Sequence, residues 1–92
     1  MKLEETIYSN YQIVRDDLNI AVAVRINGKD EYRLYDRVNV HGDIHGYICS
    51  EITEEGEGQI IKISNDRGDH FFGVLMDNGE FGFVKSLRIS RL

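Results

Sequence analysis

Two histidines and an aspartate near the middle of the chain have the spacing of a metal site. His41, Asp43 and His45 lie two residues apart, and on an extended strand this spacing would place all three on one face. A structural Zn²⁺ site takes four ligands, but His70 and Cys49 are distant in sequence and glycines interrupt the group. We therefore expect a loop here, with no metal site and no cofactor.

Other combinations that could support catalysis are also incomplete. Cys49 lies in the apolar stretch Tyr47–Ile52, a predicted strand, so we expect a buried thiol rather than a nucleophile. Glu54-Glu55 lies in an acidic, glycine-rich turn, where no burial would adapt the carboxylates to acid–base catalysis. Arg67-Gly68-Asp69 most simply forms a turn. The sequence therefore predicts a protein that is not an enzyme.

A small basic cluster near the C-terminus suggests a binding role. Lys85, Arg88 and Arg91 recur every three residues close to Phe81 and Phe83, and cations interleaved with aromatic rings can hold single-stranded nucleic acid. The whole chain, however, has 11 basic and 16 acidic residues and a net charge of −5. Because nucleic-acid binding depends on cations that neutralise phosphates, we regard this as a second alternative and expect three cations on an exposed edge.

The acidic residues suggest another alternative function. If they share one elongated face, the protein could imitate the charge of DNA, as in small phage-type inhibitors that bind a host DNA-binding protein or nuclease. A net charge of −5 is modest for such a mimic. The carboxylates of this predicted face are Asp16, Asp17, Asp30, Glu31, Glu51, Glu54, Glu55 and Glu57.

The length of the chain, 92 residues, predicts a single domain over residues 1–92 with one compact core and no deep substrate cavity. Its single cysteine excludes an intramolecular disulfide. No signal-peptide or transmembrane run is present. We therefore expect a cytoplasmic protein with no membrane contact.

The first 34 residues are predicted to form a helix followed by a hairpin. Leu3, Ile7, Tyr11, Val14 and Leu18 recur at helical spacing, which predicts one helix within residues 1–19, at about 3–18. Residues 20–34 then alternate as two strands. A two-residue turn would place charged residues on the valine face, so we predict a three-residue loop, 27–29, that pairs residue 24 with residue 32 and residue 22 with residue 34.

Residues 35–92 are predicted to form short strands, at 35–40, 47–52 and 59–63, and then a final hairpin. In the strand at 59–63, Ile61 and Ile63 are expected to point inward. The hairpin contains Asn78-Gly79, the residue pair typical of a two-residue type I′ turn. This turn pairs Met76 with Phe81.

The predicted register gives the hairpin two apolar faces. A barrel interior can take only one of them, and we expect the face with Gly73 and Gly82 to be the inner one. The other face would then be covered by the predicted N-terminal helix, or would bind a protein partner or a second copy of the chain. Its apolar residues are Phe72, Val74, Met76, Phe81 and Phe83.

The last eleven residues, GFVKSLRISRL, resemble the closing segment of SH3-like barrels, the group that includes SH3, Tudor and KOW domains. The shared order is glycine, aromatic, aliphatic, a one-turn 3₁₀ helix and an aliphatic final strand, and the Phe71-Phe72 pair also fits. The resemblance covers residues 35–92. Lys85 stands at the family's proline and Arg88 at its groove tyrosine, and the chain has no tryptophan, so proline-rich recognition is not expected.

Together these observations predict a mainly β protein: a small SH3-like β-barrel with an N-terminal α-helix and an additional hairpin. Its expected function is that of a non-catalytic protein–protein interaction module, a small cytosolic adaptor or regulator. The expected contact residues are the outer apolar residues of the hairpin together with Lys85 and Arg88.

Overall fold

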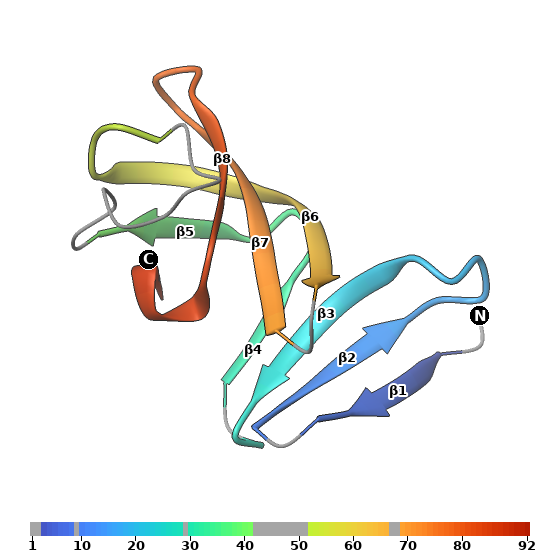
Figure 1. The fold of residues 1–92 in the computed structure, drawn as a ribbon. Helices are drawn as coiled ribbons and strands as arrows, with labels where there is room; N and C mark the ends of the chain where they lie inside the picture. The colour runs from blue at the N-terminus through green and yellow to red at the C-terminus, as the bar shows by residue number, and fades with distance from the viewer. Residues whose placement is uncertain (1–2, 9, 29, 42–51, 67–68) are drawn as a thin grey trace.

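The computed structural model describes residues 3–8, 10–28, 30–41, 52–66 and 69–92. These residues form two antiparallel β-sheets, which are not closed into a barrel (Figure 1), and they include no α-helix. The predicted loop at 42–46, most of the predicted strand at 47–52, and both Cys49 and Glu51 lie outside the described residues.

The N-terminal sheet has four strands in sequential order, β1-β2-β3-β4. They are β1 (Glu4–Ile7), β2 (Tyr11–Arg15), β3 (Ala21–Ile26) and β4 (Asp30–Arg33). The predicted N-terminal helix is therefore wrong: β1 and β2 pair as an antiparallel hairpin, in which the Tyr8 N–H donates to the Tyr11 carbonyl over 2.8 Å. Ser9 and Asn10, which compete with helical hydrogen bonding, lie between these two tyrosines.

The apolar stripe failed as a helix signal because it omitted a central residue of the core. Ile13 is fully buried and pairs with Val24 of β3, whereas Leu3, Ile7 and Leu18 of the stripe are 55%, 71% and 75% exposed. Pairing with a neighbouring strand rewards alternation rather than a 3.6-residue period. The β-branched residues of this segment also favour a strand.

The three-residue loop between β3 and β4 is confirmed. Val24 pairs with Tyr32 and Ile26 pairs with Asp30, which leaves residues 27–29 as the connection. Asn27 and Gly28 both have positive φ, 52° and 70°, a conformation that Gly and Asn adopt at least cost.

The C-terminal sheet has the strand order β8-β7-β6-β5-β9. Its strands are β5 (Arg37–Val40), β6 (Gly56–Asp66), β7 (Asp69–Met76), β8 (Phe81–Val84) and β9 (Ile89–Arg91), and a 3₁₀ turn, η2 (Ser86–Arg88), precedes the last. This turn and the final strand confirm the elements predicted for the closing segment. The far end of β6 lies against β3, where the two sheets meet (Figure 1).

A β-bulge in β6 corrects the predicted burial of its isoleucines. The pairing of β6 with β7 shifts between Ile60 and Lys62, so the alternation of inward and outward side chains is interrupted at Ile61. Ile60 and Ile63 are buried, whereas Ile61, which was expected to point inward, is 38% exposed.

The β7–β8 hairpin has a three-residue turn instead of the predicted two-residue turn. The Gly79 N–H donates to the Met76 carbonyl over 2.9 Å, and the Met76 N–H donates to the Glu80 carbonyl over 2.7 Å. Gly79 has φ of 94°, as expected for the residue that follows a tight turn in a three-residue hairpin loop. Leu75 therefore pairs with Phe81 and Gly73 with Phe83, one residue away from the predicted register.

The core lies between the two sheets as one continuous apolar cluster. Tyr11, Ile13 and Val24 reach it from the N-terminal sheet, and Ile60 and Phe72 from the C-terminal sheet. Burying one face of each sheet against the other is a standard two-layer arrangement.

Candidate interaction surface

The one-residue change of register divides the predicted partner-binding face between the core and the surface. Phe72 and Val74 are completely buried and Met76 is 4% exposed. These three residues cannot meet a partner while the core is intact, so their predicted role is wrong. A shift of one residue turns the facing strand over, and Phe81 and Phe83 consequently lie on the opposite face of the sheet, both half-buried.

The outward side of β7 and β8 carries a small group of apolar side chains. We call it the aromatic face and define it as Phe71, Leu75, Phe81 and Phe83. The rings of Phe81 and Phe83 meet edge to face with centroids 5.3 Å apart, a favourable aromatic geometry. Leu75, 42% exposed, lies directly opposite Phe81.

Gly73 makes this ring arrangement possible, because it leaves room for both rings. A Cβ atom added at Gly73 would lie 3.1 Å from Phe81 Cζ, from Phe83 Cε1 and from Lys62 Cβ. The expectation that Gly73 and Gly82 share an inner face is wrong, since Gly82 pairs with Val74 on the core side. Gly73 instead allows the Phe81 and Phe83 rings to pack closely on the outer face of the sheet.

Lys85 borders the aromatic face through an ion pair and a ring contact. Its Nζ lies 2.6 Å from Asp69 Oδ2 and 5.7 Å from the centroid of the Phe71 ring. The hydrogen bond from Lys85 lowers the pKa of the Asp69 carboxyl below its ordinary value. The ammonium group is therefore held beside an aromatic ring by a fixed carboxylate.

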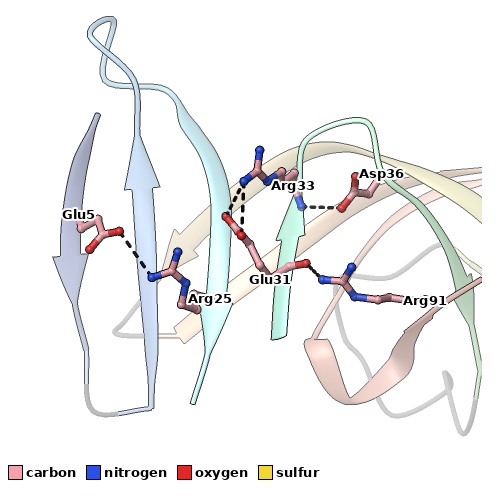
Figure 2. Close-up of polar contacts among 6 residues, drawn as sticks. All are labelled: Glu5, Arg25, Glu31, Arg33, Asp36 and Arg91. Carbon is pink, nitrogen blue, oxygen red and sulfur yellow. Dashed lines mark hydrogen bonds and ion pairs between the residues drawn. The ribbon is translucent and has the colours of Figure 1, made fainter. Parts of the chain in front are cut away.

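The other two residues of the basic cluster, Arg88 and Arg91, pack against the protein itself and do not form an exposed row that could contact phosphates. The Arg91 guanidinium donates to the Glu31 backbone carbonyl (Figure 2). It also lies 5.4 Å from the centroid of the Tyr32 ring. Arg88 lies in η2 and is partly buried. These contacts attach the C-terminal strand to β4 and do not favour nucleic-acid binding.

The acidic residues are dispersed instead of forming one elongated face. Asp16 and Asp17 lie in the loop between β2 and β3, whereas Glu54, Glu55 and Glu57 lie near the start of β6, at the opposite end of the molecule (Figure 1). The side chain of Asp30 and all of Glu51 lie outside the part of the chain that is described.

Several carboxylates are also neutralised by nearby arginines. Arg37 binds both Asp77 oxygens, at 2.8 and 2.6 Å, and reaches Glu57 at 3.3 Å. On the N-terminal sheet, Glu5 faces Arg25 at 3.9 Å and Glu31 faces Arg33 at 3.4 Å (Figure 2). Exposed pairs of this kind add little stability, but they reduce the negative field that a DNA mimic needs.

An aromatic cluster around His70 links the two sheets and was not foreseen from the sequence. His70 is 5% exposed. The centroid of its ring lies 4.5 Å from that of Tyr11 in β2 and 5.6 Å from that of Phe72 in its own strand. Tyr8 stacks on Tyr11 at 4.5 Å, and the Asn65 amide donates to the Tyr11 hydroxyl over 2.8 Å. Burial lowers the pKa of His70 below its ordinary value and raises that of Tyr11.

Within residues 3–8, 10–28, 30–41, 52–66 and 69–92, no group of three or more His, Cys, Asp or Glu side chains is placed to hold a metal ion. Asp43 and His45 of the candidate metal motif lie outside these ranges. No helix in the described part of the chain is long and apolar enough to span a membrane. Comparisons with protein-family models, with curated proteins and with solved structures gave no match.

Proposed function

We propose that this chain is a non-catalytic protein–protein interaction module, a small adaptor or regulator, that binds a partner through the aromatic face. The observation that carries the proposal is the placement of Phe81 and Phe83 outside the core, side by side over Gly73. Aromatic side chains are enriched at protein interfaces. Here they lie beside Leu75, which is 42% exposed.

The charged residues support a protein partner over the two alternatives. Lys85 and Arg91 of the basic cluster are bound to Asp69 and Glu31, so a phosphate chain would have to displace internal contacts. Carboxylates at both ends of the molecule, several paired with arginine, do not form the continuous charged surface of a DNA mimic.

The modest size of the aromatic face supports binding to another protein rather than permanent self-association. Obligate homodimers usually bury about 2,000 Å² or more in strongly apolar interfaces. On this face Leu75 is exposed, but Phe71, Phe81 and Phe83 are already half-buried. A patch of this kind fits a transient partner.

The proposal includes a cytoplasmic location, as expected from a chain whose single cysteine, Cys49, excludes an intramolecular disulfide.

Two features support the proposal that residues 35–92 are related to SH3-like barrels. The turn η2 leads into β9, and β9 returns to pair with β5 at the start of this region. Strands β5 to β8 follow one another as neighbours in the sheet. The resemblance concerns architecture, because a common fold does not specify a ligand.

Site-specific photo-crosslinking tests the proposed function. A benzoylphenylalanine placed at position 75, on the aromatic face, is compared with one at Leu87, which is 80% exposed on η2. Both proteins are irradiated in an extract of the native source, and the products are identified by mass spectrometry. We expect a discrete protein product from position 75 alone. The same products from both positions, or none from position 75, would contradict the proposal.

A further inference from the structure

A groove separate from the aromatic face lies where the two sheets meet. It has a volume of about 280 Å³. Its apolar lining consists of Ile20, Ala21, Leu34, Ile61 and Ile63. Ala21 and Ile63 are each 6% exposed and form the floor, whereas Ile20 and Ile61 are 50% and 38% exposed and form walls.

The bulge in β6 accounts for one of these walls. In a regular strand, Ile61 would pair with a residue of β7. The register shift between Ile60, which pairs with Val74, and Lys62, which pairs with Gly73, leaves Ile61 without a paired residue on β7. Bulges often reorient a side chain beside a functional site. The result is that Ile61 and Lys62, which are consecutive, both line the groove.

The charges at the groove are all of one sign, although the chain as a whole is acidic. Arg15 and Lys62 line the groove and no carboxylate does. Asp16, the nearest acidic neighbour in sequence, directs its Oδ1 into its own loop, where it accepts from the Leu18 and Ile20 N–H groups at 3.0 Å each. Two cations and no carboxylate therefore line this apolar groove, and Asp16 borders it through the Ile20 N–H.

We propose that this groove binds a short segment of another protein in which an apolar residue is flanked by acidic residues. The apolar side chain contacts Ile20 and Ile61, and the flanking carboxylates face Arg15 and Lys62. Complementary charge at the rim of an interface guides association and selects the partner. The groove and the aromatic face have no lining residue in common, although Lys62 of the groove pairs with Gly73 beneath the Phe81 and Phe83 rings.

The size and charge of the groove distinguish this occupant from others. A volume of about 280 Å³ is just below the range of small-molecule sites, about 300–1,000 Å³, and accommodates one or two side chains. The two cations that line the groove, Arg15 and Lys62, favour a segment with flanking carboxylates over one that is purely apolar.

Amide chemical shifts measured during a peptide titration test the proposal. The probe is the blocked hexapeptide Glu-Asp-Leu-Ile-Asp-Glu, added to about 2 mM, the range of weak single-segment contacts. The matched peptide has lysine at each acidic position. We expect the acidic peptide to shift the signals of Ile20, Ala21 and Ile61–Ile63, and to bind about tenfold more tightly than the basic one. Its affinity should fall with added salt.

Three variants make the test specific. Lys62→Glu should weaken binding about tenfold by charge reversal, and Ile61→Ser should weaken it by removing an apolar wall. Arg33→Glu changes the net charge equally but lies on β4 and does not line the groove, so it should bind as the unaltered protein does. Retained amide dispersion shows that each variant is folded. No binding, equal binding of both peptides, equal loss in Arg33→Glu and Lys62→Glu, or shifts confined to Phe81 and Phe83 would each overturn the proposal.

Discussion

Leu75 pairs with Phe81 across the β7–β8 hairpin, and this pairing decides which aromatic side chains reach the surface. The pairing sets Phe72 and Val74 opposite Val84 and Gly82 in the core. It leaves Phe81 and Phe83 together on the outside of the sheet. The turn of three residues, 77–79, is therefore the origin of the proposed binding surface.

Backbone NOE spectra should confirm this register. We expect cross-strand NOEs that connect Leu75 with Phe81 and Gly73 with Phe83, because directly opposed residues in an antiparallel pair have Cα atoms about 4.5–5.5 Å apart. The two-residue turn would instead give NOEs from Met76 to Phe81 and from Val74 to Phe83. Observation of that second set would show that the assignment of the two faces is wrong.

Replacement of Phe72 and of Phe83 by alanine should have unequal effects on stability. Phe72 is completely buried, so Phe72→Ala should lower the free energy of unfolding by about 3–5 kcal/mol. Phe83 is half-buried on the outer face, and Phe83→Ala should cost clearly less. Urea unfolding followed by circular dichroism measures both. Equal losses would contradict the assignment of Phe83 to the surface.

Gly58→Ala should be strongly destabilising for a steric reason. A Cβ atom at Gly58 would lie 2.7 Å from both the Leu75 carbonyl oxygen and Val74 Cγ1. The backbone at Leu75 cannot move aside as a flexible side chain can. We therefore expect the free energy of unfolding to fall by about 1–3 kcal/mol or more. Lys62→Ala on the same strand is the control, because Lys62 is exposed. Matching urea midpoints for the two variants would refute the close contact of β6 with β7.

The stability of the protein should fall as the pH decreases below about 6.5, the ordinary pKa of histidine. Burial lowers the pKa of His70 in the folded state, so the unfolded chain takes up a proton first. Stability is therefore complete above the unfolded pKa and is lost as the pH falls toward the lower folded pKa. Asp69, at 3.8 Å from His70 Nδ1, opposes this effect, while Lys85 and the burial beside Tyr11 and Phe72 reinforce it.

His70→Phe isolates this contribution, since phenylalanine fills a similar space between Tyr11 and Phe72 without titrating. Urea midpoints are compared at about pH 5.5 and 7.5, on either side of the ordinary histidine pKa. The variant should lose less stability over this interval than the unaltered protein, because it lacks the buried imidazole of His70. His41 and His45 are present in both proteins, so the difference between the two reports on His70 alone. An identical loss in both proteins would exclude His70 as the source.

The sequence predicted the β3–β4 hairpin correctly because only one register kept charged residues off the valine face. Val24 therefore had one acceptable partner, Tyr32. The β7–β8 hairpin offered no such restriction. Both of its faces are apolar, so the pattern fitted either register equally well, and Asn78-Gly79 suggested the shorter turn.

The remaining errors arose from contacts between distant parts of the chain. Tyr11 and Val14 fit both a helical and an alternating period, and only the pairing of Ile13 with Val24 decides between the two. The His70 cluster joins Tyr11 to Asn65, 54 residues apart. The groove likewise combines the β2–β3 loop with a bulge in β6, and no local pattern signals a bulge at Ile61.

The central claim, that the aromatic face binds a protein partner, is tested most directly by the affinity of the partner crosslinked at position 75. The double variant Phe81→Ser and Phe83→Ser is compared with Ile7→Ser and Leu87→Ser, which alter residues 71% and 80% exposed elsewhere. Calorimetric titration is done where circular dichroism shows both to be folded. We predict at least about a tenfold loss of affinity for the first variant, as expected for central aromatic contacts, and none for the second. Unchanged binding by the first variant, or an equal loss in both, would contradict the account.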